Sequence, residues 1–512
     1  NYCSNTNLRQ KLKRKNFQLE QNCFEKLIDD SNNIDTNLKD YINGFSDDVK
    51  EILDNFEIAT IIEKLKKAGL LYLVVQKFSE INLGADTIDN LEMGYMFEEL
   101  IRKFSEQSNE TAGEHFTPRE VIELMVEVLL DTDLDEITTT DGKVITILDP
   151  ACGTGGMLSI AQNKIRALNS RTTVVPFGQE LNPETYATCK SDMILKNNTN
   201  SKIVFGNSFS EDGFREQKFD YILSNPPFGV EWKKVKNFIE NESKHKGYDG
   251  RFGAGTPRIS DGSLLFLQHM ISKMQPIEKG GSRIGIVFNG SPLFSGDAGS
   301  GESEIRKWII EKDLLEAVIG LPDQLFYNTG ISTYVWILTN RKTDRRKGKI
   351  RLINGTSFFG KMRKSLGNKR NEITESDRKE IVRLYSTYEH DENYIDFDND
   401  DFGYRKITIE RPLYDENREV VVEKGNPKPN SKLRDTETVP FKEDIHEYFK
   451  REVLPHVPDA WIDEKKTKIG YEIPFTRHFY KFTPLRESSV ILDEIKQLEE
   501  KIQKSLNELF KG

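Results

Sequence analysis

The chain has 512 residues, enough for about three domains with buried cores. Charged residues make up 30% of the chain, and 73 basic against 83 acidic side chains give a net charge of -10. This charge neither indicates nor excludes a nucleic-acid partner, because an acidic protein can bind nucleic acid through a locally basic surface. The longest apolar run, residues 70–75, is far shorter than the ~18 residues needed to cross a bilayer, and no signal peptide is visible, so we expect neither a membrane nor a secreted protein.

Residues 1–108 predict a helical domain. Apolar residues recur every three or four positions through residues 52–65, without strand-like alternation. No group of residues here suggests chemistry, so we expect a platform for another element or subunit. Across the whole chain, the four cysteines are widely spaced and form no C-x-x-C pair, which suits a reducing compartment and predicts neither a zinc site nor a disulfide framework.

Strands and helices alternate through residues 109–345. Apolar runs predict seven strands, at residues 145–148, 174–177, 203–205, 219–223, 284–288, 315–319 and 334–338. With helices between them, these strands predict a doubly wound α/β sheet. Only eleven residues separate Gly320 from Ser332, too few for a crossover helix, so we expect the last strand to run antiparallel to its neighbour.

Residues 346–484 predict an irregular, charged extension. Between Arg341 and Arg370 there are twelve basic residues and one acid, a pattern that suits either phosphate contacts or a solvated loop. Residues 485–512 predict a long helix whose apolar positions step by three or four, close to a heptad seam. Either this helix packs on its own domain, or it docks on another chain.

The first segment with a chemical signature is glycine-rich and follows the first strand of the sheet. It comprises Asp149, Pro150, Ala151, Cys152, Gly153, Thr154, Gly155 and Gly156. Glycines allow a tight turn and close approach to a ligand, and the following helix begins with exposed N–H groups. The dinucleotide fingerprint requires a third glycine at position 158, where this chain has Leu158, so NAD is disfavoured.

The second segment places Glu180 at the end of the next strand, 27 residues after Gly153. A carboxylate there can accept hydrogen bonds from both hydroxyls of a ribose. The alternative is a surface glutamate that caps the helix beginning near Asn182.

The third segment, Ser224-Asn225-Pro226-Pro227-Phe228, follows the fourth strand. The prolines restrict the backbone and remove two N–H donors. The Asn225 side-chain oxygen and the Pro226 carbonyl can accept both hydrogens of a planar NH₂ group, and the Phe228 ring offers a surface on which a base can stack. The alternative is a proline turn that only ends a strand. A cytosine-C5 mechanism needs a nucleophilic cysteine beside this turn, and the sequence has none there.

Together these segments resemble the S-adenosylmethionine-dependent DNA N6-adenine methyltransferases, and the chain resembles the methylation subunits of type I restriction–modification systems. Further matches, all in the family's order, are Glu114-His-Phe-Thr-Pro-Arg119, Gly178-Gln-Glu-Leu-Asn182, Asp261 to His269, Val318 to Pro322 and Leu325 to Gly330. The resemblance implies a seven-stranded Rossmann-like methyltransferase sheet, with a helical domain before it and an extension ending in a long helix after it.

The resemblance also implies S-adenosylmethionine as cofactor. Its ligands would come from Glu114, His115, Phe116, Thr117, Pro118, Arg119, Asp149, Ala151, Gly153, Thr154, Gly155, Gly156, Glu180 and Asn207. Thr117, Pro118 and Glu120 predict a capping box at the start of a helix that can receive the methionyl carboxylate. Asn207 stands where the family has an acid, and its amide oxygen can accept from the cofactor's adenine. Asn225, Pro226, Pro227 and Phe228 would be catalytic.

The activity implied is methyl transfer to the N6 amine of an adenine flipped out of double-stranded DNA. The implied partners are a specificity subunit, a restriction subunit and a second methylation subunit, in the cytoplasm and with no membrane. Two alternatives stay open: a methyltransferase for another nitrogen, such as cytosine N4, an RNA adenine or a glutamine amide, and a catalytically silent scaffold of a DNA complex.

Overall fold

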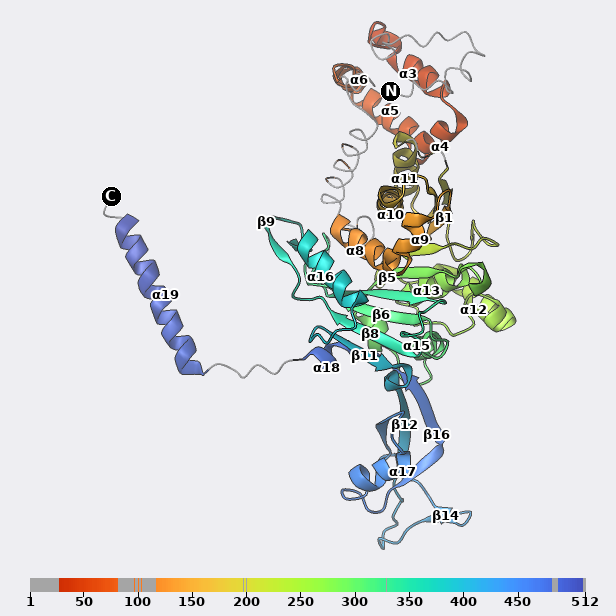
Figure 1. Ribbon diagram of the computed structural model, residues 1–512, viewed down its shortest axis with the longest axis vertical. Helices are drawn as coiled ribbons and strands as arrows, with labels where there is room; N and C mark the ends of the chain where they lie inside the picture. Colours follow the sequence, from red (N-terminus) through yellow and green to blue (C-terminus); the bar gives the residue numbers. More distant parts are fainter. Residues whose placement is uncertain are drawn as a thin grey trace. The chain divides into compact units, whose positions relative to one another are not determined.

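The computed structural model describes residues 27–81, 117–196, 198, 200–327, 329–480 and 487–509, with the single positions 96, 100 and 103 (Figure 1). The chain divides into two compact units, residues 1–473 and 474–512. No helix among the described residues is long and apolar enough to span a membrane.

Four short helices form the described part of the amino-terminal domain: α3 (Ile34–Asn43), α4 (Asp47–Asn55), α5 (Ile58–Lys67) and α6 (Leu71–Ser79). Their apolar faces meet in a small core around Ile34, Ile62 and Val75. Helix α4 contacts α11 (Pro183–Leu195), where the Glu51 carboxylate accepts hydrogen bonds from the Tyr186 hydroxyl at 2.7 Å and the Lys190 Nζ at 2.6 Å.

A mixed sheet in the order β11-β8-β6-β7-β5-β4-β1-β2-β3 forms the centre of the first unit (Figure 1). Its strands are β1 (Val144–Asp149), β2 (Thr173–Glu180), β3 (Lys202–Phe205), β4 (Tyr221–Ser224), β5 (Arg283–Asn289), β6 (Leu315–Gly320), β7 (Thr333–Thr339), β8 (Lys349–Asn354) and β11 (Tyr394–Asp398). The first seven are the predicted strands. As predicted, β7 is antiparallel, here to both β5 and β6, because the short connection leaves no room for a crossover.

Helices cover the sheet on both faces, so β5, β6 and β7 are buried almost throughout. Helices α8 (Arg119–Leu130), α10 (Gly156–Leu168) and α16 (Glu375–Ser386) share one core with apolar side chains of the strands. The remaining helices of this region are α9 (Leu134–Thr139), α12 (Lys236–Lys246), α13 (Ser263–Ser272), α14 (Ser291–Phe294) and α15 (Gly301–Glu311). The doubly wound α/β prediction is therefore confirmed.

The prediction of an irregular segment from residue 346 is wrong for much of its length. Strands β8 and β11 extend the central sheet to nine strands, and Arg378 of α16 forms ion pairs with Glu123 at 2.7 Å and Glu127 at 2.8 Å on α8. Sequence patterns missed this order because the charged side chains form ion pairs with residues far away in the chain, a relation that local periodicity does not contain.

A second, three-stranded sheet follows, in the order β15-β12-β16, with its own small core around Ile407, Val439 and Phe449. It comprises β12 (Gly403–Glu410), β15 (Asp435–Pro440) and β16 (Trp461–Tyr471), with helix α17 (Ile445–Tyr448) nearby in sequence. Two hairpins complete the unit: β9 (Gly360–Leu366) with β10 (Lys369–Glu372), and β13 (Val422–Glu423) with β14 (Asn426–Pro427).

The second unit contains α18 (Phe475–Phe479) and the predicted long helix, α19 (Ser488–Leu509). The apolar side chains of α19 are exposed along one stripe, which comprises Ile491, Ile495, Leu498, Ile502 and Leu506.

Candidate active site

The predicted chemical segments meet at one edge of the central sheet. Strands β4, β1 and β2 are parallel neighbours, so their carboxyl ends lie side by side. The glycine-rich turn follows β1, Glu180 ends β2, and the Asn225–Phe228 turn follows β4. This edge, where α/β folds bind ligands, is called the carboxyl edge below.

The glycine-rich turn has a backbone that only glycine adopts easily. Gly153 and Gly155 have φ angles of 54° and 84°, and α10 begins immediately afterwards at Gly156. A Cβ atom on Gly155 would lie 2.7 Å from the Cys189 Sγ, too close for the buried α11 side chain beneath it. Ala151, Gly153 and Thr154 are partly exposed along the turn.

Glu180 joins this turn to the end of β2. Its Oε2 accepts a hydrogen bond from the Gly153 N–H at 2.9 Å. Its Oε1 accepts from the N–H groups of Leu181 at 2.8 Å and Asn182 at 2.7 Å. These bonds hold the carboxylate in one orientation beside the turn, with the side chain partly exposed.

Asp149 connects the turn after β1 to the turn after β4. Its Oδ1 accepts from the Ala151 N–H at 3.0 Å and from the Ser224 hydroxyl at 2.8 Å. Burial disfavours the charged form and raises the pKa of Asp149 to about 7, although these two hydrogen bonds oppose the shift. Because Ser224 precedes Asn225, the two predicted functional turns share one buried polar link.

The Asn225 side chain is buried and has a definite orientation. Its Nδ2 donates to the Thr117 Oγ1 at 3.0 Å, which turns the nitrogen of the amide toward the segment before α8. Pro226 is buried and Pro227 partly exposed, whereas the Phe228 ring is buried edge-on against Phe326, with centroids 6.3 Å apart. The structure thus brings Thr117 and Asn225 together, 108 positions apart in the chain.

The predicted capping box at Thr117 is wrong. Helix α8 begins at Arg119 with Pro118 as its N-cap residue, and no side chain caps it. Thr117 instead accepts from Asn225, and Glu120 forms an ion pair with Lys369 of β10. Arg119 pairs with Glu123 at 3.2 Å. The remaining predicted cofactor residues of this segment, Glu114, His115 and Phe116, lie outside the described residues.

Asn207 lies in the loop after β3, beside the end of β2. Its Oδ1 accepts from the N–H groups of Phe209 at 2.9 Å and Ser210 at 3.3 Å. The amide oxygen therefore shapes its own loop, and the role of accepting from a cofactor's adenine stays a prediction.

The sequence reading missed Arg251, which supports this loop from the long connection between β4 and α13. Its guanidinium donates to the carbonyls of Ser208 at 2.9 Å and Phe209 at 2.6 Å, and it forms an ion pair with Glu242 at 2.7 Å. His269 is 3.2 Å away, and burial lowers its pKa to about 3. Only the family-like stretch that contains His269 signalled this region, because the sequence patterns predict the connection as a long loop and do not predict α12 within it.

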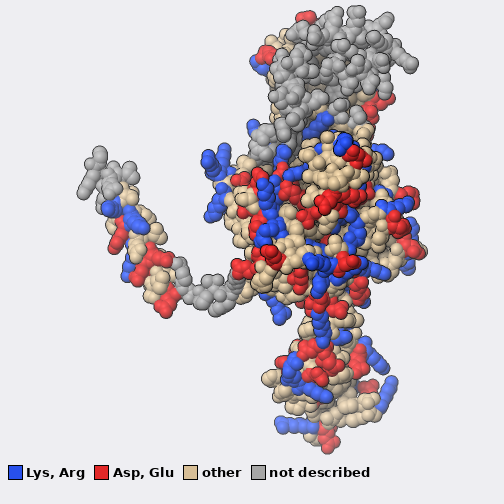
Figure 2. Space-filling view, viewed as in Figure 1, with Lys and Arg blue, Asp and Glu red and all other residues tan. Residues whose placement is uncertain are grey.

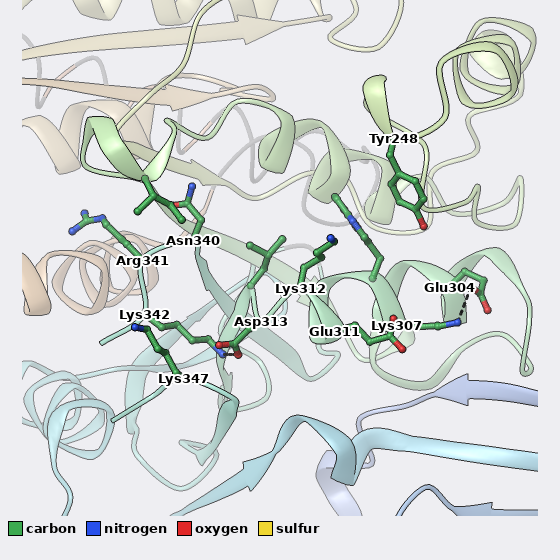
Figure 3. A pocket seen from close by; sticks show the side chains of 13 residues that line it. Tyr248, Glu304, Lys307, Glu311, Lys312, Asp313, Asn340, Arg341, Lys342 and Lys347 are labelled. Carbon is green, nitrogen blue, oxygen red and sulfur yellow. Dashed lines mark hydrogen bonds and ion pairs between the residues drawn. The ribbon is translucent and has the colours of Figure 1, made fainter. Parts of the chain in front are cut away.

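A cavity of 1260 Å³ lies at the opposite edge of the sheet, between the start of β6 and the end of β7 (Figure 3). Its charged side chains largely neutralise one another, as Lys342 pairs with Asp313 at 2.5 Å and Lys307 with Glu304 at 3.9 Å. None of the predicted site residues lines this cavity. Its volume therefore does not mark the site that the motifs define.

The strand order and the glycine-rich turn at the carboxyl edge define a Rossmann-like methyltransferase fold. A family model described as N-6 DNA Methylase matches residues 89–403, more than half of the chain. The chain belongs to this N-6 DNA methylase family.

Individual relatives of the chain are also methylase subunits. The chain is 29% identical over 343 residues, 65% of its length and 55% of the relative's, to the type I restriction enzyme MjaIX methylase subunit of Methanocaldococcus jannaschii. It is 31% identical over 280 residues, 54% of its length and 55% of the relative's, to the HindI methylase subunit of Haemophilus influenzae. The chain thus spans little more than half the length of these curated relatives.

A crystal structure shares the fold. The type I restriction-modification system methyltransferase subunit from Streptococcus thermophilus superposes with a TM-score of 0.61 at 24% identity, covering 77% of this chain and 80% of that one.

Proposed function

We propose that this chain transfers a methyl group from S-adenosylmethionine to the N6 amine of adenine in DNA, as the modification subunit of a type I restriction–modification complex. The observation that carries the proposal is the link between the two turns at the carboxyl edge. Asp149 holds the turn after β1 and, through Ser224, the base of the Asn225–Phe228 turn. A cofactor turn and an amine-binding turn are thereby held together.

The residues at this edge fit S-adenosylmethionine by their chemistry. The partly exposed Glu180 carboxylate is an acceptor suited to ribose hydroxyls, and three backbone N–H groups fix its orientation. The N-termini of α8 and α10 both lie at this edge and favour a carboxylate. Gly153 and Gly155 allow the tight left-handed turn, and the partly exposed Gly153 leaves its stretch of backbone without a side chain.

In the mechanism that we propose, the chain positions the amine. When bound, S-adenosylmethionine supplies an electrophilic methyl group on a positively charged sulfur. Asn225 and the Pro226 carbonyl hold the two hydrogens of the target amine, which aims its lone pair at the electrophile. The Thr117 hydroxyl fixes the Asn225 amide from its nitrogen side. The Phe228 ring packs edge-on against Phe326 at this turn. The rate gain comes from orientation of the amine, without a covalent enzyme intermediate.

The target adenine must leave the helical stack to reach this turn, because one hydrogen of its amine is paired with thymine and a stacked base cannot enter the site. Recognition of a sequence is assigned to a separate specificity subunit, with a restriction subunit and a second methylation subunit in the same cytoplasmic complex. This assignment is supported by the relatives, which are methylase subunits of type I restriction enzymes. The exposed apolar stripe of α19 is the element that we assign to partner docking.

Digestion of methylated DNA to nucleosides tests the proposal. The chain is purified with its co-eluting partners, incubated with duplex DNA and radiolabelled S-adenosylmethionine, and the nucleosides are separated. N6-methyladenine is expected. Label in N4-methylcytosine, in RNA or in a protein glutamine would support the alternative methyltransferases, and absence of cofactor binding by the complete complex would support the silent scaffold.

A further inference from the structure

Among the twelve basic residues from Arg341 to Arg370, the fold sets apart two groups of four with different roles. Members of the first group form ion pairs within the protein: Arg341 with Asp133, Lys342 with Asp313, Arg351 with Asp396, and Lys369 with Glu120. These side chains hold elements together, and they are therefore not available to a ligand.

The second group is on the β9–β10 hairpin and comprises Lys361, Arg363, Lys364 and Arg370, here called the hairpin cations. All four are exposed. Within the described part of the chain, none of them has a carboxylate within 4.0 Å. The one acid of the hairpin, Glu372, lies at its base, opposite Gly360. Figure 2 shows Lys and Arg gathered where the hairpin projects, at the left of the first unit.

The hairpin is attached to the carboxyl edge of the sheet. The N–H groups of Asn368 and Arg370 donate to the carbonyls of Tyr327 at 2.8 Å and Gln324 at 2.9 Å, in the loop that follows β6. The buried Lys369 joins the hairpin to Glu120 in the first turn of α8. The loop after β6 and the start of α8 both belong to the edge that holds the candidate active site. The positive charge is thus fixed on the side from which a DNA substrate must approach.

We propose that the β9–β10 hairpin is an arm that binds the phosphate backbone of duplex DNA beside the methylation site. This inference rests on the proposed function. Lys361 and Arg363 are two positions apart on one strand, so they project from the same face about 7 Å from each other and reach separate phosphates. No large apolar side chain of the hairpin is exposed, so it lacks the anchor that an interface with an acidic protein needs.

The test uses a triple variant, Lys361→Ser with Arg363→Ser and Lys364→Ser, in the full chain purified with its partners. A matched control removes one arginine and two lysines at the opposite edge: Arg215→Ser with Lys279→Ser and Lys312→Ser. All six are exposed. Affinity for a fluorescent 30-base-pair duplex is measured by anisotropy over a series of salt concentrations. Cofactor binding by calorimetry verifies that both variants fold.

The hairpin variant is expected to lower the slope of log affinity against log salt by about 2 to 3, because each phosphate contact contributes about 0.9. Its affinity at about 0.1 M salt should fall tenfold or more, while the control keeps the wild-type slope. If the hairpin variant keeps the wild-type slope while the wild type methylates DNA, the proposal that the hairpin binds phosphates is overturned and the proposed function stands. Loss of a co-eluting chain with an unchanged slope would reassign the hairpin to a protein partner. A wild-type complex that binds no DNA would overturn both proposals.

Discussion

The side chains of Asp149 and Asn225 show how single residues connect the two halves of the candidate site. Asp149 accepts from both functional turns, and Asn225 reaches back to Thr117 on the segment before α8. Neither contact is visible in a motif, since each joins residues more than 70 positions apart. The motifs identify the residue types, and the strand order of the sheet brings these residues close together.

Replacement of Asn225 by alanine tests the amine-binding role. Asn225→Ala should lower the rate of methyl transfer at least about a hundredfold, because the amine loses an oriented acceptor. Cofactor affinity should stay within about threefold of wild type, because no cofactor contact is assigned to this side chain. Single-turnover methylation and calorimetry measure the two quantities. An exposed control, Asn417→Ala, should change neither, and loss of cofactor binding in Asn225→Ala would contradict the assignment.

The raised pKa of Asp149 predicts a pH-dependent stability. The ordinary carboxyl pKa of 3.8 rises to about 7 in the folded chain, so the protonated form is favoured by folding. This contribution is complete below about pH 4 and is lost as the pH rises through 7. Asp149→Asn cannot ionise, so its free energy of unfolding should exceed that of wild type by up to about 4 kcal/mol at pH 8.

Urea titrations between pH 4 and 8 measure this difference, which should vanish toward pH 4. The exposed Asp249→Asn serves as the control and should follow the wild-type profile. Parallel profiles for wild type and Asp149→Asn would show that the carboxyl is ionised in the folded chain at neutral pH.

At the scale of elements, the carboxyl edge depends on how closely α10 and α11 approach the turn after β1. Gly155 begins the junction to α10 with a left-handed backbone, directly over Cys189 of α11. The sequence indicated glycine here because of its flexibility. The structure adds a second reason, since α11 leaves no space for a side chain.

Gly155→Ala should therefore lower the free energy of unfolding by more than backbone strain alone would, because the new Cβ also clashes with Cys189. Gly425 provides the matched control: its φ of 83° is almost the same as the 84° of Gly155, but nothing lies within 4 Å of an added Cβ. Gly425→Ala should cost about 1 kcal/mol of unfolding free energy, whereas Gly155→Ala should cost about 3 kcal/mol and weaken cofactor binding at least tenfold. Equal losses in the two variants, measured in urea, would refute the steric argument.

At the scale of the whole molecule, each of the two units carries an exposed feature outside the candidate active site. The second unit exposes the apolar stripe of α19, and the first carries the hairpin cations. A helix with so exposed a stripe gains stability by packing against a partner.

Polar substitutions in α19 test partner docking. Ile495→Ser with Leu498→Ser and Ile502→Ser should abolish co-purification of partner chains, because the buried apolar area is lost. The control, Gln497→Ser with Glu500→Ser and Lys504→Ser, changes the opposite face of the helix and should keep the partners. Both variants should keep wild-type cofactor affinity, because α19 belongs to a unit separate from the sheet. Retention of all partners by the first variant would remove the docking role.

Sequence patterns alone predict the seven strands, the antiparallel direction of β7, and the turn segments that the fold brings to the carboxyl edge. These follow from local signals: strand runs, a connection too short for a crossover, and glycine and proline at turns that require them. The folded chain adds what these patterns do not contain: β8 and β11 extend the sheet, Thr117 accepts a hydrogen bond from Asn225 and caps no helix, and Arg251 supports the Asn207 loop. It also decided which basic residues are buried in ion pairs and which are exposed. Each of these features depends on contacts between residues far apart in the chain. A local sequence pattern carries no information about such contacts.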